Sequence, residues 1–135
     1  MEDCIFCKIV QGEIPSHKVY EDDETFAFLS TGPNNKGHTL VIPKDHIENV
    51  YEMDEKHYGP MMSTVKKMAV AVKRGMNADG INVHMNNDGP AGQVVFHAHI
   101  HIIPRFKGDG LTHWPGGIYK KGEAMEAADK IKNTL

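Results

Sequence analysis

Residues 94–103 read Val-Val-Phe-His-Ala-His-Ile-His-Ile-Ile, and this stretch decides the fold. Its histidines alternate with apolar residues at intervals of two, which is the period of a β-strand. Side chains two residues apart on a strand point to the same face, at steps of roughly 6.5–7 Å. We therefore expect one strand over residues 94–103 that places His97, His99 and His101 in a row and turns the intervening apolar side chains toward a core.

Other segments with β-strand or helix character lie on the N-terminal side of this stretch. We expect strands at His17–Glu21, Thr25–Leu29, His38–Ile42 and Ile81–Asn87, and a short helix at Cys4–Val10. The acidic residues 21–24 between the first two strands predict a hairpin turn. After residue 108 the chain is glycine-rich, and it has weak helical character from Glu123 onward.

One long helix is predicted after Asp54, which has the side chain of a helix N-cap. Met61, Val65, Met68 and Val72 recur there at spacings of three or four, so they form an apolar stripe that we expect to pack in the core. Strands, one long helix and further strands with short connections predict an α+β fold with an antiparallel sheet. A doubly wound parallel sheet needs more crossover helices than this sequence offers.

The bulk properties are those of a single globular domain, which we expect to span residues 1–135, with its core at about 4–106 and a tail at 107–135. The formal net charge is −3 and no run of lysines exceeds two, so no nucleic-acid partner is predicted. No stretch approaches the ~18 apolar residues of a membrane span, and the start of the sequence is acidic. We therefore expect no membrane partner and a cytoplasmic protein.

A histidine row on a buried strand is suited to chemistry at phosphorus. Imidazole has an ordinary pKa near ~6.5, so it is largely neutral at cytoplasmic pH and available as a nucleophile. Attack by nitrogen on phosphorus divides one difficult displacement into two easier ones through a covalent intermediate. The glycine-rich run Asp88–Gly92 lies just before the row, and its backbone N–H groups can stabilise phosphoryl oxygens, although hairpin turns use the same residues.

The run His-x-His-x-His followed by two apolar residues at 97–103 resembles the signature of the histidine triad (HIT) superfamily. Further segments resemble the Hint branch, particularly small bacterial members with an N-terminal Cys-x-x-Cys. These segments are Ile5–Ile9, Glu13–Pro15, Val19–Asp22, Gly37–Lys44 and Gly92–Gln93. The resemblance covers roughly residues 4–106.

This resemblance implies a HIT-like fold that forms a homodimer with one larger continuous sheet. It implies a purine nucleotide substrate and cleavage of nucleoside phosphoramidates, or of related compounds such as dinucleoside polyphosphates, through a nucleotidyl-histidine intermediate. His99 would be the nucleophile, His101 would assist at the phosphate, and His38 would orient the nucleophile. The implied nucleotide-binding residues are Ile5, Phe6, Ile9 and Phe28 around the base, Ser30 at the ribose, and Asn86, Gly92, Gln93, His99 and His101 at the phosphate side. No organic cofactor is implied.

A second set of residues points to a metal. Cys4 and Cys7 have the spacing of half a zinc site, and two thiols without metal are the alternative interpretation. The resemblance adds His46 and His97 as the remaining ligands. A closed Cys₂His₂ set would hold a structural Zn²⁺ that ties the N-terminal segment to the sheet.

Two positions depart from the family pattern. Ser30 stands where the family usually has an aspartate that grips the ribose hydroxyls, and Val94 stands where it usually has a serine that helps to bind the phosphate or the leaving nitrogen. Serine cannot make a charged two-pronged contact, and valine cannot donate at all. A hydrogen bond to a charged group contributes roughly 1.5–3 kcal/mol. We therefore expect weaker nucleotide binding or slower turnover than in a typical member.

Two other functions compete with this one. The first is a metal-dependent hydrolase in which His97 and His99 are catalytic ligands, although the stretch contains no carboxylate to complete such a site. The second is a nucleotide-binding regulator with little catalysis, which the residues at 30 and 94 favour. In the tail, residues 113–117 read His-Trp-Pro-Gly-Gly and either reach the partner's active site in a dimer or form a surface turn.

Overall fold

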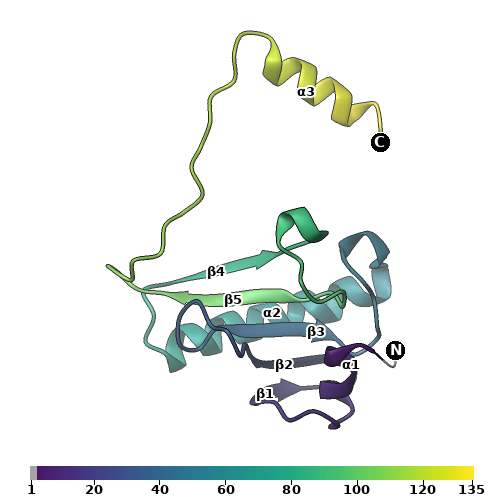
Figure 1. The fold of residues 1–135 in the computed structure, drawn as a ribbon, viewed down its shortest axis with the longest axis vertical. Helices are drawn as coiled ribbons and strands as arrows, with labels where there is room; N and C mark the ends of the chain where they lie inside the picture. Colours follow the sequence, from purple (N-terminus) through teal and green to yellow (C-terminus); the bar gives the residue numbers. More distant parts are fainter. Residues whose placement is uncertain (1–2) are drawn as a thin grey trace.

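A five-stranded antiparallel sheet forms the centre of the protein, seen in a computed structural model that describes residues 3–135 (Figure 1). The strand order is β1-β2-β3-β5-β4. The strands are β1 (Lys18–Glu21), β2 (Thr25–Leu29), β3 (Thr39–Pro43), β4 (Gly80–Met85) and β5 (Ile100–Arg105). The predicted α+β class and the antiparallel sheet are confirmed. The single domain expected over residues 1–135 stays a prediction in its limits. Residues 1 and 2 lie outside the part of the chain that the structure describes.

The long helix α2 (Glu55–Gly75) begins where the sequence indicates. The side chain of Asp54 accepts the N–H of Lys56, and His57 returns a bond to the backbone of Asp54, so the first turn is capped in both directions. A short 3-10 turn, η1 (Val50–Glu52), leads into the helix. All residues of the predicted stripe are buried against the sheet.

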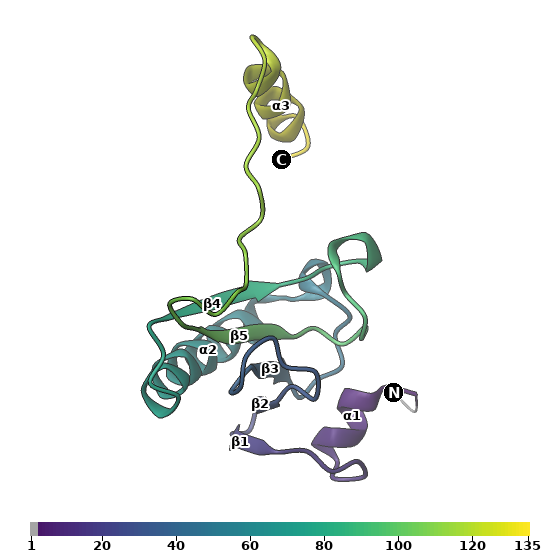
Figure 2. The same cartoon turned by 60° about the vertical axis from the view of Figure 1, so that its left-hand side comes forward.

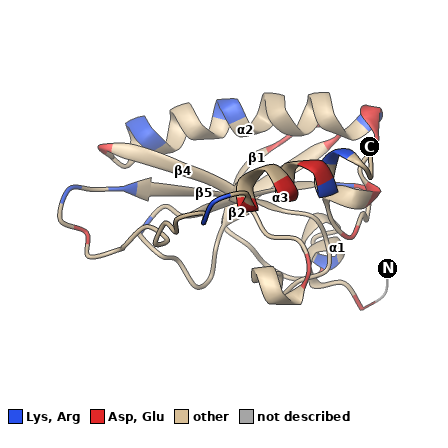
Figure 3. Ribbon diagram, turned by 90° about the horizontal axis from the view of Figure 1, so that it is seen from above, with Lys and Arg blue, Asp and Glu red and all other residues tan. Residues whose placement is uncertain are grey.

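The sheet has a core on each face because buried residues alternate along its central strands. Ala27, Val41 and Ile102 face the stripe of α2. Phe26, Phe28, Leu40 and Ile42 face the other way, where the short helix α1 (Ile5–Val10) packs with Phe6 and Ile9. Seen from above, α2 and α1 lie on opposite sides of the strands (Figure 3). The histidines of 97–103 point away from α2, so they share the α1 face.

The strand predicted over residues 94–103 is wrong in its first half. Strand β5 begins only at Ile100, and its pairing with β3 ends at Val41↔Ile100. Beyond that pair, the carbonyl of Pro43 accepts from the imidazole Nε2 of His97 at 2.8 Å instead of from a backbone N–H. The chain from 94 to 99 is therefore irregular, and His97 and His99 precede the strand rather than forming an evenly spaced row on it.

The C-terminal arm, residues 108–135, leaves the sheet as an extended chain and ends in helix α3 (Glu123–Lys132), which confirms the weak helix predicted there (Figures 1 and 2). In both views α3 lies well away from the sheet. Its apolar side chains Met125 and Ile131 are 70% and 64% exposed, and Trp114 at the start of the arm is 89% exposed. Within residues 3–135, no helix is long and apolar enough to cross a membrane.

Candidate active site and metal centre

His99 is fixed in one protonation form by the chain just before it. Its Nδ1 lies 2.7 Å from the backbone carbonyl oxygen of His97, which can only accept, so Nδ1 carries the proton. The Nε2 atom is then left with its lone pair free. The ring is 7% exposed and meets the edge of Phe6 at a centroid distance of 5.2 Å and an angle of 90°. Burial lowers the pKa of His99, so this lone pair stays unprotonated at neutral pH.

His38 and His101 form a second pair of fixed rings beside His99. The backbone N–H of Asn34 donates to Nδ1 of His38 at 3.2 Å, so the proton of the His38 ring is on Nε2. That Nε2–H donates to Nδ1 of His101 at 2.9 Å. The proton of His101 therefore lies on its Nε2, a buried atom with no hydrogen-bond partner among the described residues. The ring centroids of His99 and His101 are 4.9 Å apart, so the two rings are direct neighbours.

Burial keeps both members of this pair neutral. Removal from water, followed by the nearby imidazoles, lowers the pKa of His38 to about 4 and that of His101 to about 3. A neutral imidazole donates from one nitrogen and accepts at the other, as the chain of bonds from Asn34 requires. The pair therefore presents a directed N–H donor and not a positive charge.

The residues predicted to surround the base lie in two different places. Phe6, Ile9 and Phe28 are buried in one cluster, with the rings of Phe6 and Phe28 at 5.4 Å edge to face. Ile5 lies apart from them: it is 46% exposed and lines a separate hollow of about 410 Å³ with His46 and Phe96. The structure thus brings three of the four predicted residues into one cluster, in which Phe6 contacts the ring of His99.

The glycine-rich loop forms the 3-10 turn η2 (Gly89–Ala91) and places its residues unequally. The side chain of Gln93 is buried, with 3% exposed. Its amide oxygen accepts the backbone N–H of Asp88 at 2.8 Å, and its amide nitrogen donates to the carbonyl of Glu48 at 2.7 Å. The Gln93 amide therefore stabilises the loop. Asn86 approaches Gly92, whose φ of +101° is the left-handed conformation that glycine adopts readily. Val94 is 85% exposed.

Ser30 lies in the loop before β3. Its hydroxyl accepts the N–H of Gly32 at 3.2 Å, which leaves its own proton for another partner. The departures from the family pattern at 30 and 94 are thus both on accessible parts of the chain.

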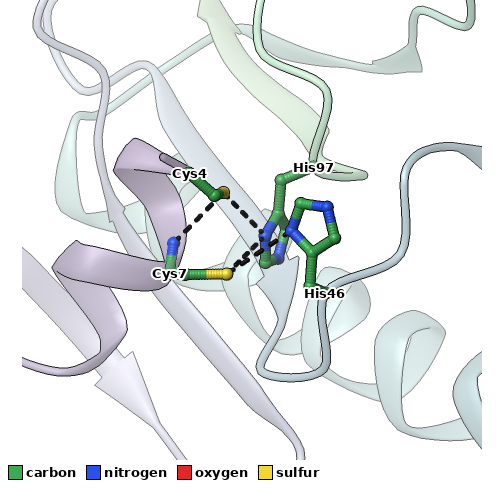
Figure 4. A group of neighbouring side chains, drawn as sticks. All are labelled: Cys4, Cys7, His46 and His97. Carbon is green, nitrogen blue, oxygen red and sulfur yellow. Dashed lines mark hydrogen bonds between the residues drawn. The ribbon is translucent and has the colours of Figure 1, made fainter. Parts of the chain in front are cut away.

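Cys4, Cys7, His46 and His97 converge from three parts of the chain (Figure 4). One possible ligand atom from each lies within 4.8 Å of all the others, which a single ion can bridge. The hydrogen bond from His97 Nε2 to Pro43 leaves the lone pair on Nδ1, which lies 3.4 Å from the sulfur of Cys4. A metal-binding imidazole is usually held by such a bond from its other nitrogen. The donor set is the Cys₂His₂ type that zinc prefers, so the residues fit the ion.

Comparisons with known proteins agree with this geometry. The family model described as HIT domain matches residues 11–108, more than half of the chain. The chain belongs to the HIT family. This HIT protein is 51% identical over 120 residues to "Protein hit" of Bacillus subtilis, and the match covers 88% of this chain and 80% of that relative. It is 44% identical over 109 residues to "Adenylylsulfatase HINT3" of Arabidopsis thaliana, covering 81% of this chain and 55% of that protein.

Solved HIT structures match the whole fold. A crystal structure of a Streptococcus mutans protein superposes with a TM-score of 0.93 at 42% identity, covering 99% of this HIT protein and 86% of that chain. A Zn-bound histidine triad family protein from Mycobacterium smegmatis superposes with a TM-score of 0.78 at 33% identity, covering 99% of both chains. The predicted family and fold are confirmed, and the family is one of nucleotide-binding histidine triad proteins that includes hydrolases.

One site residue of this HIT protein was missed by the sequence reasoning. The ring of His84 stacks on that of His101 at 4.7 Å with 25° between their planes. The two residues are directly paired in the register of β4 and β5. Correct pairing of those two strands, both of which the sequence indicates, would have found this contact.

Proposed function

We propose that this protein cleaves nucleoside phosphoramidates or related nucleotidyl compounds, such as dinucleoside polyphosphates, and releases a nucleoside monophosphate. The observation that carries the proposal is the hydrogen bond from His99 Nδ1 to the His97 carbonyl, at 2.7 Å. It leaves a buried, neutral Nε2 lone pair as the nucleophile. Kinship with a protein called adenylylsulfatase supports a reaction at a nucleotidyl phosphorus.

The reaction proceeds in two displacements. The lone pair of His99 Nε2 forms a bond to phosphorus, and the bond from phosphorus to the leaving nitrogen or oxygen breaks. The leaving group departs with that bonding pair and is protonated. Water then attacks phosphorus, loses a proton, and displaces Nε2, so that nucleoside monophosphate and neutral His99 are regenerated.

His101 and the apolar cluster stabilise the bound nucleotide in this scheme. The unpartnered Nε2–H of His101 donates to a phosphoryl oxygen, where negative charge increases in the transition state. His38 fixes that donor by supplying its own Nε2–H to the opposite nitrogen of His101. Phe6, Ile9 and Phe28 cover the purine base, while Ser30, Asn86, Gly92 and Gln93 are predicted to lie along the ribose and phosphate.

Replacement of the nucleophile tests this function. His99→Ala, assayed with a fluorogenic adenosine phosphoramidate, is expected to lose turnover by orders of magnitude. His17→Ala is the matched control because His17 is also a histidine, but its side chain is exposed and has no hydrogen bond or ring contact with His99 or His101 among the described residues. Full activity of His99→Ala would overturn the proposal. Tight nucleotide binding by a wild-type protein without turnover would favour the regulator instead, which the residues at 30 and 94 make the second candidate.

We further propose that Cys4, Cys7, His46 and His97 hold a structural Zn²⁺. A closed four-ligand set leaves no position for substrate, so the ion's contribution is to fold stability. Within residues 3–135 this is the only cluster of three or more potential metal ligands. Of His97, His99 and His101, the cluster includes only His97. Elemental analysis is expected to find one zinc per chain in the wild type and none in Cys7→Ser; equal zinc in both proteins would contradict the ligand assignment.

We also propose that the protein is a homodimer. Strand β4 lies at the edge of the sheet, and Val83 on it is 45% exposed. Antiparallel pairing of two such edges would extend the sheet and cover this surface. The arm, with Trp114 at its start, is then long enough to reach the second protomer. Light scattering after size exclusion is expected to give twice the chain mass, and Val83→Lys to reduce it; a wild-type monomer at micromolar concentration would refute this.

A further inference from the structure

The loop of residues 30–37 determines how His38 is oriented. The backbone N–H of Asn34 donates to Nδ1 of His38 at 3.2 Å and is the contact that puts the ring proton on Nε2. In the same loop, the backbone N–H of His38 donates to the carbonyl of Asn35 at 3.0 Å. The backbone of His38 is also held by Ser30, whose N–H donates to the His38 carbonyl at 2.9 Å. The position of the loop therefore decides chiefly which nitrogen of the His38 ring carries the proton.

Asn35 anchors the loop to the far end of strand β5. Its side-chain nitrogen donates to the carbonyl of Pro104 at 2.9 Å and to a carboxylate oxygen of Asp109 at 3.0 Å. An amide with both protons engaged is held in one orientation. Asn35 is the side chain of this loop that reaches across to β5, so the loop depends on it for its place.

The acceptor for Asn35 is itself rigid. Asp109, whose side chain is 8% exposed, accepts from Nε and Nη2 of Arg105 at 2.8 and 3.1 Å. It also accepts the backbone N–H groups of Phe106 and Leu111 at 3.0 Å each. A carboxylate held by a two-pronged arginine and by backbone donors is strongly bound in one position. The same carboxylate thus holds Asn35 and the first residues of the arm.

We propose that Asn35, held by Asp109, is a positioning residue for His38 and through it for the free N–H of His101. This inference rests on the proposed function, because the relay matters for turnover only if His101 acts on phosphate. Without the anchor, the loop moves away from β5 and Nδ1 of His38 loses its donor. The His38 ring then populates both neutral forms, and His101 no longer presents a single fixed donor.

Two kinds of measurement test the proposal, and one of them needs no turnover. In Asn35→Ala, ¹⁵N NMR of the His38 ring is expected to change from a single Nε2–H form to a mixture. The kcat for adenosine phosphoramidate is expected to fall about fivefold, the value of one hydrogen bond, with KM nearly unchanged. Asn35→Asp, which sets a carboxylate against that of Asp109, is expected to give a larger loss of kcat.

A double-mutant comparison separates positioning from general destabilisation. In a His38→Asn background, Asn35→Ala is expected to add no further loss of kcat. The matched control is Asn82→Ala, because Asn82 accepts from Nη1 of Arg105 at 2.7 Å but has no bond to the loop; it should leave kcat and the His38 spectrum unchanged. Additive losses, or an unaltered His38 spectrum in Asn35→Ala, would overturn the inference. Absence of turnover in the wild-type protein would overturn the proposed function but not the positioning of His38 by Asn35, because the ¹⁵N NMR spectrum of His38 tests that positioning without turnover.

Discussion

Removal of metal from the Cys4, Cys7, His46 and His97 cluster is predicted to disturb the nucleophile as well as the fold. The side chain of His97 is one of the proposed ligands, and its carbonyl oxygen accepts the Nδ1–H of His99 at 2.7 Å. Phe6 lies on α1 between the two cysteines and packs its edge against the same His99 ring. Two contacts of the proposed nucleophile therefore belong to parts of the chain that the metal would hold together.

The size of both effects can be worked out. Zinc at 1,000 times its Kd stabilises the folded state by about 4.1 kcal/mol. A chain of 135 residues unfolds with an entropy near 0.28 kcal/mol/K, at about 2.1 cal/mol/K per residue, so chelation should lower Tm by about 14 °C. Loss of the single bond that fixes His99 costs about 1 kcal/mol, which is about fivefold in kcat.

The assay compares zinc-loaded and chelated protein by calorimetry, by turnover of adenosine phosphoramidate and by ¹⁵N NMR of His99 below the melting temperature. Returning zinc should restore all three values, and Cys7→Ser should be insensitive to the chelator. A chelated protein with a lower Tm but an unchanged His99 spectrum and kcat would refute the coupling between metal and nucleophile.

Three further perturbations have defined outcomes. Burial and the neighbouring imidazoles lower the pKa of His38 to about 4, from an ordinary value of 6.5, so the unfolded chain binds this proton first as pH falls. Urea unfolding should show about 1.4 kcal/mol of stability lost per pH unit from this ring between pH 6.5 and about 4, and His38→Asn should lose that part of the slope. The double variant Ser30→Asp, Val94→Ser should raise kcat/KM by roughly 10- to 150-fold, because a hydrogen bond to a charged group contributes roughly 1.5–3 kcal/mol. An unchanged kcat/KM would show that neither position limits the reaction. Met61 packs against the sheet and is 2% exposed, so Met61→Ala should lower the free energy of unfolding in urea by about 2–5 kcal/mol. A loss below about 1 kcal/mol would mean that the stripe is not tightly packed.

The sequence predicted the elements whose signals are local. The spacing of Met61, Val65 and Met68 and the cap at Asp54 specify a helix through contacts within a few residues, and α2 begins where they indicate. The β1–β2 hairpin is likewise set nearby: Asp22 accepts the N–H groups of Glu24 and Thr25 at 2.9 and 2.7 Å.

The sequence misled where a distant partner decides the outcome. The alternation of histidines with apolar residues at 94–103 is compatible with any extended chain. The pairing of β3 with β5 ends at Ile100, because the carbonyl of Pro43 accepts from the His97 side chain instead of continuing the β-ladder. The contacts of Asn35 with Asp109 and of His84 with His101 also join residues far apart in the chain, so no local pattern reveals them. The cluster of four potential metal ligands was predicted from a resemblance to known proteins, since Cys4 and Cys7 alone are half a site.

The central claim is that Nε2 of His99 becomes bonded to the phosphorus of the substrate. Rapid acid-free quenching of wild-type protein with excess adenosine phosphoramidate, followed by intact-protein and peptide mass spectrometry, measures this directly. A nucleoside monophosphoryl adduct is predicted that forms within one turnover, maps to His99 and is absent from His99→Ala. Steady turnover with no adduct at any time, or an adduct on His101 or His38, would contradict the account.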